Sequence, residues 1–295
     1  MNLVYTLGID VGGTSIKSGL VTKSGDLTDE QSHPTPQNDE QAGALVERIQ
    51  QIVESYDRDT LSAVGVAIPG IVSSDGVAEF SASLGYRGVP LRTLLESAIN
   101  LPVRVVHDVT AAGLAEHRVG MTRQYRNTAV IQIGTGIAAS VVIDGKPYRP
   151  HPFIGEIGHT PSPYARPCAC GLIGCLEMTA SGGAMRRNYL AQTGTDTTAA
   201  EIFQLAHDGD RIAQSLYDEF IDALAGAIIW LSTILGPEAV VLSGGVAAAG
   251  DSLRHDLARA VSRKKSFHLV PEILVSGDYT RMGCRGAGLM AWAEA

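Results

Sequence analysis

Three of the four cysteines lie close together in the segment PCACGLIGC, as Cys168, Cys170 and Cys175, and His159 lies a short distance upstream. Three thiolates and one imidazole make a complete tetrahedral ligand set for Zn²⁺, and four protein ligands with no open position are typical of a structural site. The glycines of the segment allow the chain to fold sharply around an ion. A disulfide and unpaired thiols are the alternatives, and Cys170 and Cys175 are spaced more widely than the CxxC of redox proteins.

Two carboxylates flank this candidate metal segment. Glu156 belongs to GEIGH, which ends at His159, and Glu177 lies two residues after Cys175. An ion that folds the segment would bring both acids near the imidazole, which can bind metal through one nitrogen and donate a hydrogen bond from the other. Because carboxylates accept hydrogen bonds from hydroxyl groups, the pattern indicates a site for a polyhydroxylated ligand. Two acids on the protein surface are the alternative.

Three glycine-rich turns follow apolar segments and suit phosphate binding, because backbone N–H groups approach a phosphate closely only where no side chain intervenes. The chain contains neither the GxxxxGK[ST] of a P-loop nor the GxGxxG of a dinucleotide-binding turn. Ordinary turns of an α/β protein are the alternative. The residues concerned are Gly12, Gly13 and Thr14 in the first turn, Gly134, Thr135 and Gly136 in the second, and Gly244 and Gly245 in the third.

Charged side chains accompany the first turn. Asp10 precedes it and Lys17 follows it. Since Mg²⁺ keeps several of its waters in proteins, we expect Asp10 to hold this ion through water. The third turn is expected to open a helix whose N-terminus faces a nucleotide.

Asp108 lies where a predicted strand runs into an alanine-rich helix, in VRVVHDVTAAGLAEH. An aspartate at a helix start often does no more than accept hydrogen bonds from unpaired N–H groups. Phosphoryl transfer to an alcohol needs a carboxylate that accepts the hydroxyl proton, and a strand end provides a rigid position for it. Taken by itself, the segment leaves both interpretations open.

The periodicity of apolar residues predicts an internal duplication. Residues 6–27 and 128–147 each predict a β-hairpin around a glycine turn. Helices are predicted over 40–56, 90–100 and 212–235, and buried strands over 61–70 and before the third glycine turn. The repeated unit is strand, strand and helix.

Composition narrows the functional classes. The 295 residues carry 45% hydrophobic and 18% charged residues, which indicates a well-filled globular core. The net charge of −8, without a basic stripe, predicts no nucleic-acid partner. No signal peptide is recognisable at the start of the sequence. No membrane span is recognisable either, because the most apolar segment, 223–236, is too short. We therefore expect a cytoplasmic protein, in which disulfides are disfavoured and Cys284 is a small buried apolar residue.

The twin hairpin turns resemble those of the actin-like ATPase fold, and this resemblance implies ATP. More specifically, the chain resembles the ROK family (repressors, open reading frames, kinases) over nearly its whole length. The segments that carry the resemblance are GIDVGGTSIKSGLV, HDVTAAGLAE, IGTGIAASVVIDGKP, GEIGHTP, PCACGLIGCLEMTASG and VVLSGGVAAAG.

The resemblance implies a two-domain α/β fold of the actin-like ATPase type (ribonuclease H-like, hexokinase-type), with duplicated ββ-hairpin/α units around a cleft. We expect a smaller domain over 1–118, completed by the C-terminal helix 284–295, and a larger domain over 119–283 with the zinc loop 155–178. The implied activity is transfer of the γ-phosphate of ATP, with Mg²⁺, to a hydroxyl of a hexose, most often the 6-hydroxyl. By resemblance Asp108 is the general base, Glu156, His159 and Glu177 hold the sugar, and the zinc ligands are His159, Cys168, Cys170 and Cys175.

Departures from the family pattern concern the sugar. Family glucokinases usually have asparagines where this chain has Ser83, His107 and Thr110, and by position Ser83 and His107 are expected to contact the sugar. The identity of the sugar therefore stays open.

Two other functions are compatible with the resemblance. One is a sugar-binding protein without kinase activity, and the other is a sugar-sensing repressor. Family repressors carry a winged helix before the first phosphate turn, and we expect none here because Asp10 lies near the start of the sequence. The family commonly forms dimers or tetramers, so a homo-oligomer is expected.

Overall fold

The computed structural model describes residues 4–267 and 269–295 and divides the chain into two compact units. Unit 1 comprises the described residues of 1–123 together with 146–154 and 280–295, and unit 2 comprises 124–145 and the described residues of 155–279. The return of 146–154 to unit 1 has no counterpart in the division expected from the sequence. Among the described residues, no helix combines the length and apolar character that crossing a membrane requires.

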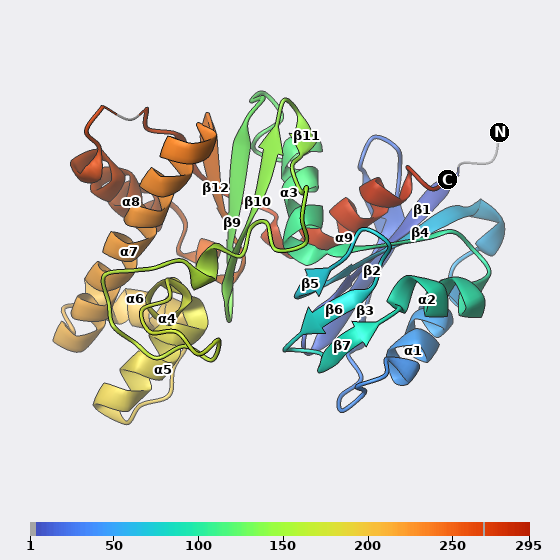
Figure 1. Cartoon of the computed structure of the whole chain (residues 1–295), viewed down its shortest axis with the longest axis horizontal. Coiled ribbons are helices and arrows are strands. Elements are labelled where there is room, and N and C mark those ends of the chain that lie inside the picture. The colour runs from blue at the N-terminus through green and yellow to red at the C-terminus, as the bar shows by residue number, and fades with distance from the viewer. Residues whose placement is uncertain (1–3, 268) are drawn as a thin grey trace. The chain divides into compact units, whose positions relative to one another are not determined.

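Unit 1 is built on a sheet with the strand order β3-β2-β1-β4-β8 (Figure 1). The predicted first hairpin is confirmed, since β1 (Tyr5–Val11) and β2 (Ser15–Val21) pair antiparallel. Strand β4 (Leu61–Ile68) runs parallel to β1, and β8 (Val103–His107) runs parallel to β4. Strand β3 (Leu27–Pro34) completes the sheet beside β2.

The helices of unit 1 bury one face at helical spacing. In α1 (Gly43–Glu54) and α2 (Leu91–Ile99), both predicted, the buried residues include Leu45, Ile49 and Ile52, and Leu91, Leu95 and Ile99. Helix α3 (Asp108–Arg118) follows β8 directly. A small sheet that the sequence analysis missed consists of β5 (Ile71–Val72), β6 (Ala78–Ser81) and β7 (Tyr86–Val89). The remaining short elements are η1 (Arg58–Thr60) and β11 (Lys146–Pro147).

The C-terminal helix α9 (Tyr279–Ala291) packs against the N-terminal strands, and Figure 1 shows it in red beside β1 and β4. Its backbone approaches these strands closely at glycines. A Cβ added at Gly8 would lie 2.1 Å from the carbonyl oxygen of Cys284, and one at Gly65 would lie 1.9 Å from that of Ala287. Both ends of the chain are therefore needed for the core of unit 1.

Unit 2 repeats the strand pattern of unit 1. The second predicted hairpin is confirmed as β9 (Thr128–Ile133) and β10 (Ile137–Ile143), which pair antiparallel. Strand β12 (Ala239–Ser243) runs parallel to β9, and β13 (Glu272–Val275) runs parallel to β12. A hairpin flanked by a parallel strand is thus present in both units, which confirms the predicted duplication.

Helices supply the rest of the core of unit 2. The predicted long helix is α7 (Arg211–Leu235), which begins at the N-cap Asp210 and ends at Gly236 in the left-handed conformation. The other elements are η2 (Ile157–His159), α4 (Glu177–Ala180), α5 (Gly182–Thr193), α6 (Ala199–His207), η3 (Gly245–Ala249) and α8 (Gly250–Lys264). The helix expected at the third glycine turn is the 3₁₀-helix η3, which begins at Gly245, and α8 follows it from Gly250.

The close approach of α9 is testable at Gly65. We expect Gly65→Ala to lower the melting temperature by several degrees, because the added methyl group would overlap the carbonyl of Ala287 and overpacking costs about 1–3 kcal/mol. Gly226→Ala is the matched control, since a Cβ in the middle of α7 meets nothing within 4 Å. That change should be neutral or stabilising, by up to about 1 kcal/mol. Thermal unfolding followed by circular dichroism measures both, and equal melting temperatures for the two variants would contradict the predicted packing.

Candidate active site and metal cluster

Parallel strand pairing determines where the candidate residues of unit 1 lie. Asp10 pairs with Ala67 across β1 and β4, and Ile68 pairs with His107 across β4 and β8. The carboxyl ends of parallel strands meet at one edge of a sheet, so the first glycine turn and Asp108 lie at the same edge. With one strand between them, their strands are about 10 Å apart.

The first glycine turn is held by the start of β2 and by the segment that follows β3. The N–H of Gly12 donates to the carbonyl of Ser15 over 2.9 Å. The hydroxyl of Thr35 donates to the carbonyl of Gly12 over 2.8 Å, and the amide of Gln37 donates to the carbonyl of Gly13 over 2.9 Å. A Cβ at Gly13 would lie 3.8 Å from that of Ser83, so the structure brings Ser83 beside this turn.

Asp10 lies at the end of β1, directly opposite Lys17 on β2. Burial raises the pKa of the Asp10 carboxyl to about 6, and the ammonium of Lys17 only partly opposes this shift. The Nζ of Lys17 also donates to the carbonyl of Thr280 over 3.0 Å. A carboxylate whose charge is incompletely compensated suits a site for a cation, which is the chemistry that the sequence predicts for Asp10.

Asp108 is the first residue of α3, and His107 occupies the N-cap position before it. Its Oδ1 accepts a hydrogen bond from the N–H of Val109 over 2.8 Å, and the Nε2 of His107 lies 3.2 Å from the same oxygen. The side chain of Asp108 is 20% exposed, whereas that of His107 is 3% exposed. The carboxylate is therefore held through Oδ1 by its neighbours in the chain and remains accessible to solvent.

In unit 2 the second and third glycine turns line a common hollow of about 580 Å³. Parallel pairing again explains this, because Ser243 of β12 pairs with Gln132 of β9 just before the two turns. The start of α5 closes the hollow: the N–H of Gly182 donates to the carbonyl of Gly134 over 2.9 Å, and a Cβ at Gly183 would lie 2.4 Å from the carbonyl oxygen of Thr135. The predicted Gly134, Thr135 and Gly245 are thus brought together.

Further residues of this hollow were not predicted. They are Gly182, Gly183, Arg186, Arg187, Leu190, Asp196, Thr198, Ala199, Ala200 and Val246. The guanidinium of Arg186 contacts both carboxylate oxygens of Asp196, at 2.5 and 2.6 Å. A signal was available in the sequence, because Ser181-Gly182-Gly183 combines a helix N-cap with two glycines; the hydroxyl of Ser181 accepts a hydrogen bond from the N–H of Ala184.

The two predicted sugar acids of unit 2 lie at the ends of the cysteine segment. Glu177 begins α4, and its Oε2 accepts a hydrogen bond from the N–H of Ile137 over 3.1 Å. A Cβ at Gly136 would lie 2.5 Å from the same oxygen, so Glu177 is placed against the second glycine turn. Glu156 lies just before η2, where the carbonyl of Gly155 accepts a hydrogen bond from Ala139 of β10 over 2.7 Å.

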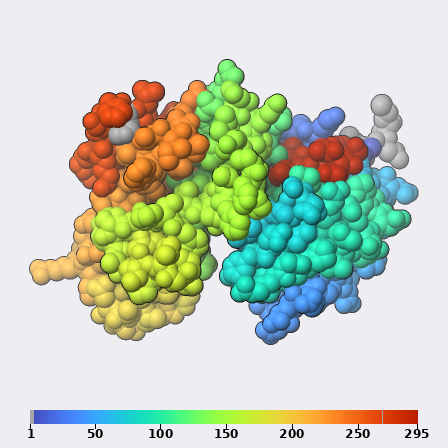
Figure 2. All heavy atoms as spheres, in the orientation of Figure 1, coloured from blue at the N-terminus to red at the C-terminus, as the bar shows by residue number. Residues whose placement is uncertain are grey.

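The cysteine segment forms a compact ligand cluster at the surface of unit 2, within the yellow-green region of Figure 2. One atom from each of the four predicted ligands lies within 4.8 Å of all the others. The Sγ of Cys168 is 3.7 Å from the Nδ1 of His159, and the Sγ atoms of Cys170 and Cys175 are 3.5 Å apart. A tetrahedral zinc with bonds of about 2.0–2.3 Å separates its ligand atoms by similar distances, so the donor set fits this ion.

Cys284 lies apart from this cluster. It is 2% exposed, and its thiol donates to the carbonyl of Gly8 over 3.0 Å. All four cysteines are free in the structure. The expectation that Cys284 is buried is confirmed, and burial raises the pKa of its thiol.

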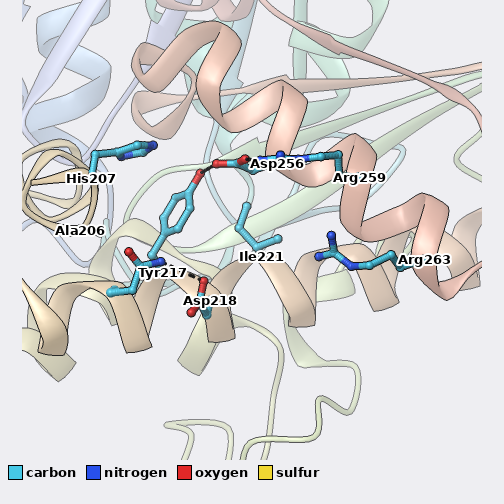
Figure 3. Close-up of a pocket in the computed structure, with 9 residues that line it drawn as sticks. Ala206, His207, Tyr217, Asp218, Ile221, Asp256, Arg259 and Arg263 are labelled. Carbon is cyan, nitrogen blue, oxygen red and sulfur yellow. Dashed lines mark hydrogen bonds and ion pairs between the residues drawn. The ribbon is translucent and has the colours of Figure 1, made fainter. Parts of the chain in front are cut away.

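Another hollow of unit 2, of about 330 Å³, lies between α6, α7 and α8 (Figure 3). Figure 3 shows Tyr217 and Arg259 pointing toward Asp256. The hydroxyl of Tyr217 donates to Asp256 over 2.8 Å, and Arg259 forms an ion pair with the other oxygen of that carboxylate. The charge of Asp256 is thus compensated by side chains of the hollow itself.

Comparison with known proteins places the chain in a family. The model of the ROK family matches residues 6–294. The protein belongs to the ROK family. Among its relatives, a glucokinase of Halalkalibacterium halodurans is 33% identical over 84% of this chain and 82% of its own length. An N-acetyl-D-glucosamine kinase of Escherichia fergusonii is 29% identical over 81% of this chain and 83% of its own.

A solved structure supports the same assignment. The ROK family glucokinase of Streptomyces griseus, in complex with glucose and AMPPNP, is 25% identical and matches with a TM-score of 0.82 over 98% of this chain and 99% of its own. The predicted two-domain fold of the actin-like ATPase and hexokinase type is confirmed by this match and by the repeated hairpin units.

Proposed function

We propose that this ROK protein is an ATP-dependent sugar kinase that transfers the γ-phosphoryl group to a hydroxyl of a hexose or hexose derivative. The 6-hydroxyl is the acceptor that we expect. The observation that carries this proposal is the carboxylate of Asp108, fixed at the edge of the sheet of unit 1 that also holds the first glycine turn. The relatives named above are kinases of glucose and of N-acetylglucosamine, so both sugar classes are candidates.

In the proposed reaction Asp108 acts as general base. The hydroxyl oxygen of the sugar forms a bond to the γ-phosphorus, its proton moves to the carboxylate of Asp108, and the bond between the γ-phosphorus and the bridging oxygen breaks to release ADP. The hydrogen bond from Val109 and the close contact with His107 at Oδ1 orient the carboxylate for this step. The side chain of Asp108 is 20% exposed, so a ligand can reach it. This access fits a general base at a strand end better than a residue that only caps a helix.

The glycine turns are proposed to hold the phosphates, because a phosphate can approach their backbone closely; they are Gly12, Gly13 and Thr14 in unit 1 and Gly134, Thr135, Gly136, Gly244 and Gly245 in unit 2. The ammonium of Lys17 is proposed to add positive charge beside the first turn. Mg²⁺ near Asp10 would neutralise phosphate charge, and the raised pKa of this carboxyl is consistent with a cation partner. The hollow beside α5 has apolar walls at Leu190, Ala199 and Val246 that suit the adenine and ribose of a nucleotide.

The sugar is proposed to be bound by Glu156, His159 and Glu177, with Ser83 as a further contact. Carboxylates accept hydrogen bonds from sugar hydroxyls, and Glu177 is already fixed by Ile137. His159 would use Nδ1 for a metal and Nε2 for the sugar, which agrees with the 3.7 Å separation of Nδ1 from the thiol of Cys168.

The His159, Cys168, Cys170 and Cys175 cluster is proposed to hold a structural Zn²⁺. The ion would fold the segment between Glu156 and Glu177 and so position both acids. With four protein ligands the site leaves no position for a reactive water, so we assign it no catalytic step.

The proposal also covers the location of the enzyme, its partners and its oligomeric state. We expect the enzyme to act in the cytoplasm on a small-molecule sugar and ATP as a homodimer or homotetramer, without a nucleic acid or membrane partner. A protein that binds sugar without transferring phosphate is the alternative, favoured only by the departures at Ser83, His107 and Thr110.

The kinase proposal is tested by an ADP-release assay over a broad panel of hexoses and acetamido-hexoses. We expect at least one sugar to stimulate ADP release, and Asp108→Asn to lower kcat by about 10²- to 10⁴-fold, because a general base contributes this much. Sugar binding, measured by calorimetry, should change little. Asp210→Asn is the control, since Asp210 also lies at a helix start, where it is the N-cap of α7 and accepts a hydrogen bond from the N–H of Ala213, but it belongs to none of the proposed sites. If no sugar stimulates ADP release while Asp108→Asn binds sugar like the wild type, the protein is a binder.

The zinc proposal is tested by metal analysis of the purified protein. We expect about one equivalent of zinc per chain, and Cys175→Ser should lose most of it and lower the melting temperature, because one of the four ligands is removed. Cys284→Ser is the control, since Cys284 lies outside the cluster and serine can keep its hydrogen bond to Gly8. Protein that contains no zinc, or equal zinc in both variants, would refute the assignment.

A further inference from the structure

A chain of close polar contacts connects Asp108 to Arg149 inside unit 1. The Nε2 of His107 lies 3.2 Å from the Oδ1 of Asp108, and its Nδ1 lies 3.3 Å from the hydroxyl of Thr110. That hydroxyl accepts a hydrogen bond from Nη1 of Arg149 over 2.7 Å. His107 is 4% exposed and Thr110 is 7% exposed, so water does not provide their main partners.

The chemistry of the four groups favours one arrangement of the protons. Arginine only donates, so the oxygen of Thr110 must accept from Arg149 and its O–H is available for His107. Burial lowers the pKa of His107 to about 3, helped by the positive charge of Arg149, so its imidazole is neutral. A neutral imidazole has one donor and one acceptor. With the proton on Nε2, the ring presents an N–H to the carboxylate of Asp108 at 3.2 Å, and Nδ1 accepts from Thr110.

The reverse arrangement is unfavourable. A proton on Nδ1 would face the hydroxyl of Thr110, whose other partner among the described residues, Arg149, cannot accept a proton from it. The lone pair of Nε2 would then face a carboxylate oxygen at 3.2 Å, where the two groups repel each other. Only the Nε2–H tautomer gives every group in this buried chain a partner of the right kind.

We propose that Arg149, Thr110 and His107 form a positioning relay that orients the carboxylate of Asp108 for proton transfer, and that His107 acts on Asp108 instead of on the sugar. The inference rests on the proposed kinase function and deepens it. Both ring nitrogens of His107 already have partners within unit 1. None of the three residues touches the reacting atoms, so each is a positioning residue.

Two features explain why the relay holds the carboxylate firmly. The Nε2 of His107 and the N–H of Val109 both contact the same oxygen, Oδ1, and two contacts restrict rotation of the carboxylate more than one does. At the other end Arg149 is anchored by a second hydrogen bond, from Nη2 to the carbonyl of Pro152 over 2.7 Å. The arginine also lines a hollow of about 330 Å³, so its replacement meets little steric resistance.

The first test is a set of threonine variants assayed with the best sugar from the panel. Thr110→Val keeps the shape but breaks the relay, and we expect kcat to fall about tenfold to a hundredfold, since small displacements of a reacting group cost up to about 10²-fold. KM for the sugar should change less than about twofold. Thr110→Ser should restore most of the loss. Thr122→Val is the matched control, because Thr122 is buried in the same unit and its hydroxyl has no hydrogen-bond partner in the described structure.

The relay also predicts that its members act as one unit. Arg149→Met and Thr110→Val should each lower kcat, and the double variant should lose little more than the worse single variant. His107→Gln should retain more activity than His107→Leu, because the glutamine amide can place a donor near the position of Nε2. Fully additive losses, an unchanged kcat in Thr110→Val, or a raised KM at constant kcat would overturn the proposal, and the last result would make His107 a sugar contact.

A second measurement does not depend on activity. In protein with ¹⁵N-labelled histidine, NMR at neutral pH should show His107 as the neutral Nε2–H tautomer, and the signal is assigned by its loss in His107→Gln. The Nδ1–H tautomer or a charged ring would refute the relay even if the protein is a kinase. If the wild type acts on no sugar, the kinase proposal fails, and the tautomer still decides the hydrogen-bond order.

Discussion

Parallel strand pairing is the constraint on which the candidate sites depend. In unit 1 it brings the end of β1, with Asp10 and the first glycine turn, to the same sheet edge as the end of β8, with Asp108. In unit 2 it aligns the ends of β9 and β12, so that the second and third glycine turns line one hollow. Residues far apart in the sequence therefore become neighbours through backbone hydrogen bonds alone, before any side chain contributes.

The sheet of unit 1 also packs closely against helix backbone. Helix α9 approaches β1 and β4 so closely that Gly8 and Gly65 have no room for a side chain. On its other side, a Cβ at Gly286 would lie 1.8 Å from the carbonyl oxygen of Ala111 in α3, the helix that begins with Asp108. The position of the proposed base thus depends on the C-terminal helix as well as on the strand that precedes it.

Features with a local cause could be predicted from the sequence. The hairpins at 6–27 and 128–147, the helix starts and the cysteine cluster depend on glycine spacing, apolar periodicity and short-range ligand spacing, and the structure contains all of them. Arg149 could not be predicted, because its partner Thr110 lies 39 positions away and nothing in the segment around it suggests a contact. The small sheet of β5 to β7 was missed because its strands are two to four residues long, too short for alternation to be recognised.

The departures from the family pattern at positions 107 and 110 belong together physically. A histidine at 107 is buried, and a buried imidazole needs an acceptor for its proton and a donor for its lone pair. Asp108 provides the acceptor and Thr110 provides the donor. Arg149 donates a hydrogen bond to the threonine oxygen, and its positive charge disfavours a second proton on the ring of His107. With both nitrogens of His107 occupied, recognition of sugar hydroxyls would fall to the groups of unit 2 and to Ser83. Sugar preference and the alignment of the base are then controlled by separate residues, so a change in one need not disturb the other.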